Sequence, residues 1–298
     1  MNGVTPKTAL LLTAPPLLWA GNAVVGKLMV GAVPPLSLNF LRWVLAGLIL
    51  LPLGWRVLRG DSALWARWRR FSMLGLLGVG SYNALQYLAL QTSTPINVTL
   101  IAGSMPVWML AAGALFYRVR PHSRQVLGAA LSLAGVVLVI SRGNWATLMQ
   151  LKLVPGDLYM IIATLMWALY SWMLARPSDN SAREWHWAEF LLAQIVFGAA
   201  WAGAAAGLEA AMIDVRIQWT SAVVAALFYI AIGPSLIAYR CWGIGVAAVG
   251  PAIAAFFSNL APVFAAVLSA ALLGDAPRWF HGGAFALIVA GIVVSSRR

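Results

Sequence analysis

The sequence predicts an all-α integral membrane protein with ten transmembrane helices, arranged as two inverted five-helix repeats. Three observations lead to this fold class: the composition, ten long apolar runs and a repeat within the chain. Of the 298 residues, 62% are hydrophobic and 9% are charged, whereas soluble domains have roughly 45–50% and 25%. A soluble protein with so few charges could not cover its surface, but a chain in lipid needs polar residues only in its loops and helix ends. A water-soluble fold is therefore excluded.

Ten apolar runs have the length of about 20 residues that an α-helix needs to cross the hydrocarbon core. Each run is bounded by charged residues or by clusters of Pro and Gly. The first is long for the apolar core of a signal peptide, so we interpret it as a transmembrane helix. The predicted spans are 8–30, 36–54, 71–91, 95–117, 124–141, 157–175, 187–208, 221–240, 250–273 and 279–296.

The distribution of basic residues predicts the orientation. The net charge is +12, but Lys and Arg lie mostly between the apolar runs rather than in one basic patch, so we expect no nucleic-acid partner. The loop 55–70 contains five Arg, and the next even-numbered loop contains Arg118, Arg120 and Arg124. The positive-inside rule places both loops in the cytoplasm. We therefore expect a multi-pass protein of a cell inner membrane with both termini cytoplasmic.

The second half of the chain repeats the first. Four Pro or Gly positions recur at one constant offset of 156 residues: Pro95 with Pro251, Pro106 with Pro262, Pro121 with Pro277, and Gly135 with Gly291. Each half contains five spans, an odd number, so the second half must enter the membrane in the opposite orientation. We predict a first repeat over 1–142, a periplasmic linker over 143–156 and an inverted second repeat over 157–298.

Inverted repeats are typical of secondary transporters, because two halves related by an axis in the membrane plane place a site near the midplane that opens to either side. The alternative from another class is a polytopic enzyme that modifies lipid, which needs an acid/base or metal cluster at one interface. The sequence has no nucleotide-binding fingerprint, no catalytic-triad pattern and a single cysteine, Cys241. We therefore expect no enzymatic activity, no cofactor and no metal.

Several motifs resemble those of a known family. They are the stretch PLSLNFLR over 35–42, Ala261-Pro262-Val263-Phe264-Ala265-Ala266, Leu273-Gly274-Asp275 and His281-Gly282-Gly283. As an ordered set over the whole chain they resemble the EamA family of the drug/metabolite transporter superfamily, and within it the YddG-type exporters of aromatic amino acids. The resemblance implies an inner-membrane exporter whose central cavity is walled by the first, third, fourth, sixth, eighth and ninth spans. It implies that the fifth and tenth spans lie outside the cavity.

Polar and aromatic side chains in the third span predict a cavity wall. Tyr82 and Gln86 are spaced i,i+4, as are Asn83 and Tyr87, so these residues follow one side of the helix. A side that carries phenols and amides does not face lipid cheaply. The alternative interpretation is hydrogen bonding between helices. We favour the cavity because four such residues exceed the needs of one helix contact.

Two repeat-related spans each carry a tryptophan with a polar residue one turn later. Trp19 precedes Asn22 in the first span, and Trp167 precedes Tyr170 and Ser171 in the sixth. A pair of tryptophans suits a cavity that holds an aromatic or apolar body, whereas the alternative for each is packing.

Proline and glycine predict hinges in three spans. Gly233 and Pro234 break the eighth span ahead of Tyr239, and Pro106 and Pro262 lie within the fourth and ninth spans. Each proline removes a backbone donor and favours a kink. The alternative to a hinge for alternating access is a fixed bend; the equivalent placement of Pro106 and Pro262 in the two halves favours the hinge.

Charged residues are not forced to the middle of any span. We place Lys27 and Arg42 in the outer half of the membrane, where Lys27 either snorkels or meets a substrate carboxylate. Asp157 and Glu189 fall in first helical turns, where the helix dipole favours them.

Stripes of small residues predict packing surfaces, and we expect a monomer or a weak homodimer. These stripes are Gly128, Ser132 and Gly135 in the fifth span and Gly282, Ala286 and Ala290 in the tenth.

These observations predict a secondary transporter that exports aromatic or other hydrophobic amino acids by alternating access. Trp19, Trp167 and Tyr170 are expected to contact the apolar side chain of the amino acid. Its amine and carboxylate are expected to bind the polar residues of the wall, which are Asn22, Tyr82, Asn83, Gln86 and Tyr239. The alternative cargo is another small metabolite or a drug. Proton exchange and facilitated diffusion both fit the sequence.

Overall fold

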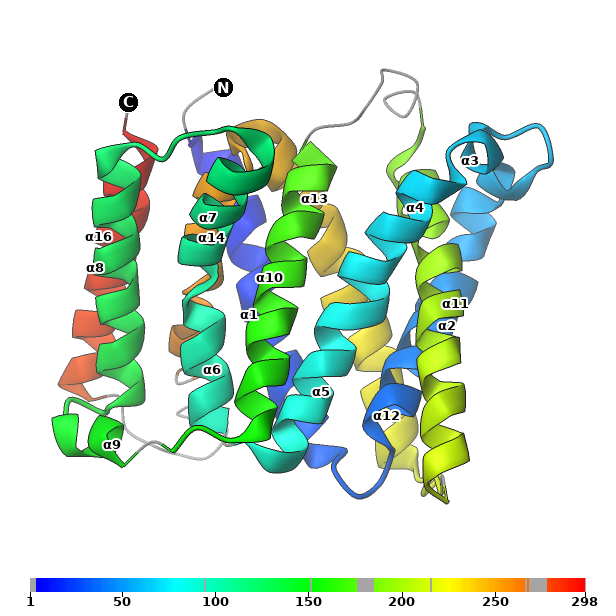
Figure 1. The fold of residues 1–298 in the computed structure, drawn as a ribbon, viewed down its shortest axis with the longest axis horizontal. Coiled ribbons are helices and arrows are strands. Elements are labelled where there is room, and N and C mark those ends of the chain that lie inside the picture. Colours follow the sequence, from blue (N-terminus) through cyan, green and yellow to red (C-terminus); the bar gives the residue numbers. More distant parts are fainter. Residues whose placement is uncertain are drawn as a thin grey trace.

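The protein consists of helices that stand side by side in one bundle (Figure 1). The computed structural model describes residues 4–93, 95–150, 152–175, 185–214, 216–265, 267 and 278–297. Within these ranges every regular element is a helix, which confirms the all-α fold class. Both ends of the chain lie at the same end of the bundle as α3 (Ala63–Ala66), and α9 (Trp145–Met149) lies at the other. We call these ends the terminal end and the distal end.

In the first half, three of the five predicted spans are continuous helices: α1 (Pro6–Leu28), α2 (Pro35–Gly54) and α8 (Ser123–Ile140). A short 3-10 helix, η1 (Trp55–Leu58), follows α2. The third span consists of α4 (Trp68–Leu74), a π-helical segment η2 (Gly75–Ser81) and α5 (Tyr82–Thr92). The fourth consists of α6 (Pro95–Gly103) and α7 (Met105–Tyr117), which are separated at Ser104.

In the second half, α10 (Pro155–Ala175), α11 (Trp187–Met212) and α16 (Trp279–Ser296) are continuous. The eighth span consists of α12 (Ser221–Ile230), the π-helical segment η4 (Ala231–Ile237) and α13 (Ala238–Val249). It extends beyond the predicted end at residue 240. Arg240 continues the helix, and its Cζ atom lies 4.4 Å from the centroid of the Trp187 ring. The ninth span begins with α14 (Pro251–Ser258), and residues 266 and 268–273 of its predicted range lie outside the described residues.

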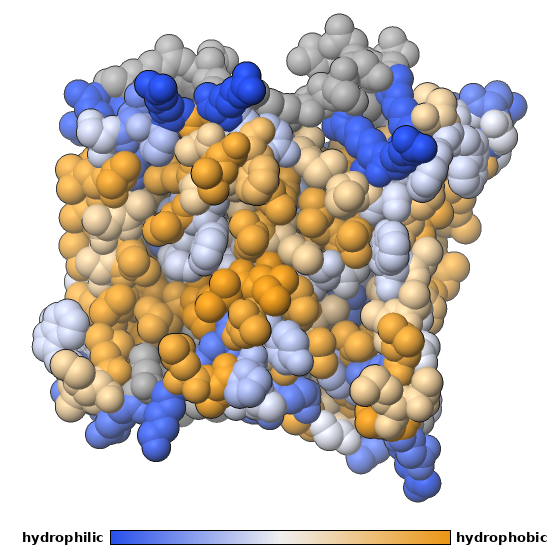
Figure 2. Space-filling view, viewed as in Figure 1, coloured by the Kyte–Doolittle hydropathy of each residue, from blue (hydrophilic) through white to orange (hydrophobic). Residues whose placement is uncertain are grey.

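The bundle has the surface of a membrane protein. Among the described residues, seven helices are long and apolar enough to cross a membrane: α1, α2 together with η1, α8, α10, α11, the run from α12 to α13, and α16. Hydrophobic side chains cover the middle of the face seen in Figure 2, and hydrophilic side chains gather at its two ends. This distribution matches a hydrocarbon core between two aqueous surfaces.

The fifth and tenth spans, α8 and α16, pack against each other at one edge of the bundle (Figure 1). A Cβ atom on Gly128 would lie 2.7 Å from the carbonyl oxygen of Gly291, so the two backbones touch where neither carries a side chain. The predicted stripe on α8 thus is a packing surface. The predicted stripe on α16 does not face α8, because Gly282 and Ala286 are exposed and α16 packs through Ala284, Ile288 and Gly291 instead.

A buried carboxylate caps the first turn of α2. Glu209, near the end of α11, accepts hydrogen bonds from the backbone N–H groups of Leu36 at 3.0 Å and Ser37 at 2.8 Å, and from the Ser37 hydroxyl at 2.8 Å. The free N–H groups and the positive dipole end of a helix stabilise a negative charge at this position. Glu209 therefore connects the second helix of one half to the second helix of the other.

The two π-helical segments occupy equivalent places in the two halves. Segment η4 begins at Ala231, 156 residues after Gly75, and ends at Ile237, 156 residues after Ser81. The offset is the one that relates the prolines of the two halves. A π-helical turn is rare and is frequently found at functional sites, because it interrupts the regular hydrogen-bond ladder of the helix.

Carbonyl groups of both π-helical segments receive hydrogen bonds from other helices. Asn39 Nδ2 of α2 donates to the carbonyl oxygens of Val79 and Gly80 in η2, at 3.3 Å each. Trp19 Nε1 of α1 donates to the carbonyl oxygen of Pro234 in η4 at 3.3 Å. Irregular backbone at membrane depth requires such partners. These bonds attach the interrupted helices to the first two helices of the chain.

Candidate functional site

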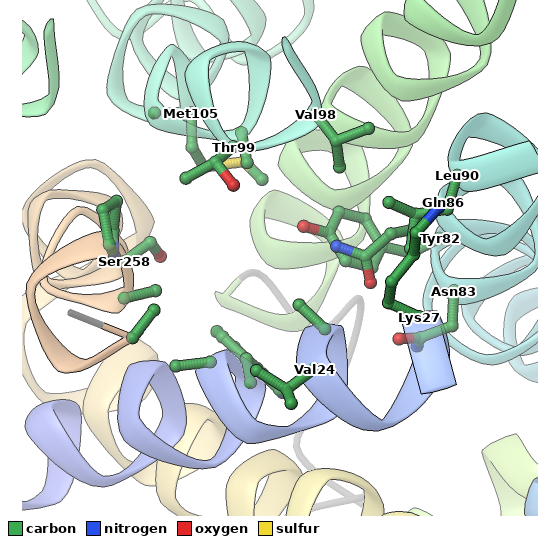
Figure 3. Close-up of a pocket in the computed structure, with 18 of the residues that line it drawn as sticks. Val24, Lys27, Tyr82, Asn83, Gln86, Leu90, Val98, Thr99, Met105 and Ser258 are labelled. Atoms are coloured by element: carbon green, nitrogen blue, oxygen red, sulfur yellow. The ribbon is translucent and has the colours of Figure 1, made fainter. Parts of the chain in front are cut away.

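A cavity of about 370 Å³ lies in the interior of the bundle. Its walls come from α1, α5, α6, α7, α10, α13 and the residues 258–265 (Figure 3). These belong to the first, third, fourth, sixth, eighth and ninth predicted spans, which are the ones that the family resemblance implies. Helices α8 and α16 contribute no residue to this lining. The volume is that of a pocket for a small organic molecule.

The cavity occupies the half of the bundle next to the distal end. Its lining on α1 begins at Trp19, near the middle of the helix, and continues to Leu28 at the distal end. On α5 it runs from Tyr82 to Leu90, and on α10 it consists of Trp167, again near mid-helix. Because the lining at the end of α1 is exposed, the cavity reaches the surface there.

Aromatic rings close the cavity towards the terminal end. Trp167 is only 2% exposed and contacts five other rings at centroid distances of 5.0 to 5.6 Å. Edge-on and tilted contacts of this kind stabilise an aromatic cluster beyond its buried area. We call the rings that separate the cavity from the terminal end the aromatic floor: Trp19, Trp167, Tyr239 and Trp242.

Beyond the aromatic floor the helices are closely packed. A Cβ atom on Gly245 of α13 would lie 2.2 Å from Leu12 Cδ2 of α1, and Leu12 is fully buried. Trp242 Nε1 donates to the Ser171 hydroxyl of α10 at 3.2 Å. The described residues therefore leave the cavity closed towards the terminal end.

One side of the cavity carries most of its polar groups. Figure 3 shows Lys27, Tyr82, Asn83 and Gln86 together at this side, whereas Met105 lies across the cavity from them. Three of the four come from α5, whose i,i+3 and i,i+4 spacing aligns them. We call Lys27, Asn83 and Gln86 the polar wall. No Asp, Glu, His or Cys is found among the described residues that line the cavity.

The structure brings six of the eight predicted binding residues to the cavity surface: Trp19, Tyr82, Asn83, Gln86, Trp167 and Tyr239. The other two lie behind the lining. Tyr170 is 2% exposed and donates through its hydroxyl to Gln194 Oε1 at 3.0 Å. Asn22 is 1% exposed and donates through Nδ2 to Asn83 Oδ1 at 3.3 Å. Both side chains contact neighbouring helices instead: Asn22 bonds residues of α2 and α5, and Tyr170 bonds a residue of α11.

Tyr239 reaches the cavity from α13 and also supports η2. Its hydroxyl donates to the carbonyl oxygen of Gly78, and its ring lies 5.0 Å from that of Trp43. Gly78 is also in close contact with Tyr170, because a Cβ atom on Gly78 would lie 2.6 Å from the Tyr170 ring. Tyr239 therefore connects the eighth span to the third.

The surroundings of Arg42 were not predicted from the sequence. Arg42 is the eighth residue of α2, about 10 Å along the helix, and we expected it in the outer half of the membrane. That depth stays a prediction, but the structure shows that Arg42 is 0% exposed and lies inside the bundle. Distance along a helix predicts depth, but it does not tell which face turns inward. Asn39, one turn earlier on the same face, was a signal for a polar interior face that we did not use.

The guanidinium group of Arg42 is held by neutral partners. Nε donates to the Ser235 hydroxyl at 2.6 Å, and Nη1 donates to Asn22 Oδ1 at 3.2 Å and to the Tyr87 hydroxyl at 3.1 Å. Nη2 has no hydrogen-bond partner within the described part of the chain. The side chain also lies against Trp43, with Cζ 5.2 Å from the ring centroid. Arg42 thus connects α2 to α1, α5 and η4 without a carboxylate.

The predicted hinge residues lie at helix breaks. Pro106 is the second residue of α7 and follows the break at Ser104, and Gly233 and Pro234 lie within η4. Pro262 follows the turn at residues 259–260 and lines the cavity. Their positions suit bending, and their role as hinges stays a prediction.

Among the described residues, no group of three or more His, Cys, Asp and Glu is placed to hold a metal ion. What the site offers is an aromatic and apolar volume with amide and ammonium groups at one side. Such a site can hold an amphipathic small molecule.

Comparison with known proteins agrees with this geometry. The sequence profile of the EamA-like transporter family matches residues 6–141 and 154–297. The chain is 28% identical over 286 residues to the aromatic amino acid exporter YddG of Ancylobacter novellus, covering 94% of this chain and 93% of that protein. It is 28% identical over 298 residues to an uncharacterized transporter of Archaeoglobus fulgidus, covering 98% of both.

Two further similarities cover nearly the whole chain. The uncharacterized inner membrane transporter YedA of Escherichia coli K12 is 25% identical over 288 residues, which cover 93% of this chain and 87% of YedA. A solved crystal structure superimposes with a TM-score of 0.72 at 24% identity, covering 98% of this chain and 96% of the other, so the two share a fold. Since the family profile matches both halves of the chain, the protein belongs to the EamA-like transporter family and is a membrane transporter.

Proposed function

We propose that this transporter exports aromatic or other hydrophobic amino acids across a bacterial-type inner membrane by alternating access. The observation that carries the proposal is the cavity, which combines an aromatic floor with a polar wall in the interior of a membrane-embedded bundle. The floor provides ring contacts for an apolar side chain, and the wall provides groups for a charged amino acid backbone. The similarity to a protein named as an aromatic amino acid exporter favours the same cargo class.

An architecture of ten spans in two inverted repeats supports the alternating-access mechanism. The offset of 156 residues relates η2 to η4, and the break at Ser104 corresponds to the turn at residues 259–260. The family profile also matches the two halves of the chain separately. Two halves of opposite orientation allow one site to open to either side as one half rocks against the other. Pro106, Pro262 and the Gly233-Pro234 pair are the hinges in this proposal.

The conformation described here corresponds to the outward-facing state in this proposal. The terminal end carries the Arg-rich loop 55–70 and is cytoplasmic by the positive-inside rule. The cavity lies in the opposite half, so it faces the periplasm. Turning to the inward-facing state requires the rings of the aromatic floor to separate. Trp19 donates a hydrogen bond to η4, and Tyr239 lies in α13, which directly follows η4.

The eight predicted binding residues have different roles in this proposal. Trp19 and Trp167 contact the apolar side chain of the amino acid, and Asn83 and Gln86 bind its charged groups together with the hydroxyls of Tyr82 and Tyr239. Asn22 and Tyr170 act from behind the lining, since Asn22 donates a hydrogen bond to Asn83 of the polar wall and the Tyr170 ring lies 5.0 Å from that of Trp167 in the aromatic floor. The alternative cargo is another small metabolite or a drug with one apolar and one polar end.

A counterflow assay in proteoliposomes tests the proposal. Vesicles containing the purified protein are loaded with L-phenylalanine, and uptake of labelled phenylalanine is measured with unlabelled phenylalanine, tryptophan, alanine and glutamate as competitors. We expect the two aromatic amino acids to compete best and the recovered solute to be chemically unchanged. Equal competition by alanine would contradict aromatic selectivity, and a chemically modified solute would favour the alternative of a polytopic membrane enzyme. Protein-free liposomes serve as the control.

A further inference from the structure

The described interior of the bundle holds one fully buried arginine, Arg42, whose position the transport mechanism above does not use. The two ion pairs found among the described residues, Arg59 with Asp61 and Arg216 with Asp214, are at the exposed surface. A guanidinium group taken out of water without a carboxylate costs several kcal/mol unless hydrogen bonds replace the lost hydration. A residue placed at such a cost has a structural or a functional use.

The chemistry of arginine sets the direction of every hydrogen bond around it. A guanidinium group has five donors and no acceptor, so the Asn22 atom that faces Arg42 Nη1 must be the oxygen Oδ1. The Tyr87 hydroxyl accepts from Arg42 Nη1 and donates to the same Oδ1 at 2.9 Å. The amide nitrogen of Asn22 therefore points the other way and donates to Asn83 Oδ1.

Asn83 is the last member of this chain of bonds and the one that lines the cavity. Its oxygen is occupied as an acceptor, so its amide nitrogen Nδ2 remains as a donor. Within the described residues Nδ2 makes no hydrogen bond. Hydrogen bonds in series polarise one another, and the positive charge at the start of this series strengthens the donor at its end. Gln86 and the Lys27 ammonium lie at the same side of the cavity (Figure 3).

We propose that Arg42 is a positioning residue that acts through Asn22 to hold the Asn83 amide as a hydrogen-bond donor towards the cavity, so that the polar wall selects the carboxylate group of the cargo. The proposal rests on the proposed function and extends it. The cargo lies with its carboxylate against Asn83 and Lys27 and with its apolar side chain towards the aromatic floor. No acidic residue is present in the described lining to bind an amine in the same way.

The physical consequence is a ranking of ligands that share one ring. A carboxylate gains a charge-assisted hydrogen bond from Asn83 and attraction from two cations, Lys27 at the wall and Arg42 behind it. An amine without a carboxylate gains none of these and meets repulsion. We therefore expect 3-phenylpropionate, which has a carboxylate and no amine, to bind at least about tenfold more tightly than 2-phenylethylamine.

The test measures binding of L-phenylalanine, 3-phenylpropionate and 2-phenylethylamine to the purified full-length chain in nanodiscs, by quenching of tryptophan fluorescence. Asn83→Asp keeps an oxygen to accept from Asn22 but replaces the donor by an anionic acceptor. We expect this variant to reverse the order of 3-phenylpropionate and 2-phenylethylamine. Asn144→Asp, at the exposed N-cap of α9, adds the same charge away from the cavity and is expected to leave the order unchanged.

Substitution of Arg42 itself separates positioning from packing. Arg42→Gln can both donate and accept, so it no longer dictates the orientation of Asn22. We expect the carboxylate preference to fall to about threefold or less, and the KM for phenylalanine transport to rise more than kcat falls. Arg42→Lys, which only donates, is expected to restore part of the preference. Arg59→Gln removes an exposed cation and is the matched control.

Three results would overturn the proposal or separate it from the proposed function. Asn83→Asp with the wild-type ligand order overturns it, and this variant is decisive even where Arg42→Gln does not fold, because it leaves the Arg42 contacts in place. Arg42→Gln that weakens all three ligands equally also overturns it, since that is the result of a packing role. If phenylalanine is neither bound nor transported while the carboxylate preference and its reversal persist, the proposed cargo is wrong and the role of Arg42 stands.

Discussion

The π-helical segments η2 and η4 lie at equivalent positions of the two halves, yet they contact the opposite half through different chemistry. Segment η2 packs on α11 through bare backbone, since a Cβ atom on Gly75 would lie 2.6 Å from the nitrogen of Gly198. Segment η4 packs on α2 through a polar contact, in which Arg42 Nε donates to the Ser235 hydroxyl at 2.6 Å. The repeat therefore preserves the breaks in the backbone while the side chains at those breaks differ.

This difference explains how a symmetric frame contains an asymmetric site. The first half supplies the polar wall, which consists of Lys27, Asn83 and Gln86, and it also supplies Arg42 behind this wall. The first half also supplies Trp19 and most of the apolar lining, whereas the second half supplies Trp167, Tyr239 and the apolar residues around Pro262. Alternating access needs equivalent breaks in both halves, whereas binding an amphipathic amino acid in one orientation needs one polar and one apolar side. In the proposed mechanism the backbone meets the first need and the side chains meet the second.

The largest effect is expected at the glycine contact of η2. In Gly198→Leu the new side chain would begin 2.3 Å from Val79 Cβ and 2.9 Å from the Gly75 carbonyl oxygen. Overpacking this contact should destabilise the protein by about 3 kcal/mol or more, seen as loss of the monodisperse peak in size-exclusion chromatography. Gly207→Leu on the same helix, where a Cβ atom has open space, should elute as the wild type. Equal behaviour of the two variants would contradict the close contact.

Breaking the polar contact of η4 should destabilise the protein less than overpacking the glycine contact of η2. Ser235→Ala removes the acceptor of Arg42 Nε and leaves that donor buried and unpaired, at a cost of about 1–3 kcal/mol. A thermal melt of the detergent-purified protein should show a lowered midpoint. Ser296→Ala, which removes an exposed hydroxyl bonded within its own helix, should melt as the wild type. A midpoint unchanged by Ser235→Ala would mean that the Arg42 contact is not made.

The Glu209 cap of α2 should contribute a similar or smaller amount to the stability of the protein. Glu209→Ala leaves the N–H groups of Leu36 and Ser37 without their acceptor, and loss of a helix cap costs about 0.5–2 kcal/mol. Glu209→Gln retains an acceptor oxygen and should recover part of the loss in the same thermal melt. If Glu209→Gln is as damaging as Glu209→Ala, the negative charge at the helix end outweighs the hydrogen bonds.

The smallest effect concerns selectivity at the aromatic floor. Trp19 is half-buried, lines the cavity and lies 5.2 Å from Trp167. Trp19→Ala should lose one ring contact with the cargo, worth about 0.5–1.5 kcal/mol, and thus narrow the preference for phenylalanine over alanine by about two- to tenfold. Competition in the counterflow assay measures it, with Trp145→Ala on exposed α9 as the control. Equal loss for both amino acids would make Trp19 a packing residue.

The features that depend on local pattern could be predicted from the sequence. Apolar run length predicted the long helices, and i,i+4 spacing placed Tyr82, Asn83 and Gln86 on one face of α5. Glycine and proline at 233 and 234 predicted the break that the structure shows as η4. Each of these follows from the geometry of a single helix, so no knowledge of neighbouring helices was required.

The features that depend on contacts between distant segments could not be predicted in this way. Arg42 is interior because Asn22, Tyr87 and Ser235 from three other segments converge on it. Glu209 caps a helix that begins 174 residues earlier, at Pro35. The short glycine contact between η2 and α11 also depends on tertiary packing. A helical pattern gives the direction of a side chain relative to its own helix, but the partner that lies in that direction is set by the whole fold.

Accessibility of the cavity from one side of the membrane tests the central claim most directly. A single cysteine is introduced by Ala102→Cys, at a residue that lines the cavity, in a Cys241→Ser background that removes the one native cysteine. Intact cells are treated with a membrane-impermeant maleimide, with and without L-phenylalanine, and Ser62→Cys in the Arg-rich loop serves as the cytoplasmic marker. The account predicts that the cysteine at residue 102 is labelled in intact cells and protected by phenylalanine, while the cysteine at residue 62 is labelled only after the cells are opened. Labelling at residue 102 that requires opened cells, or that phenylalanine does not slow, would contradict an outward-facing cavity that binds this cargo.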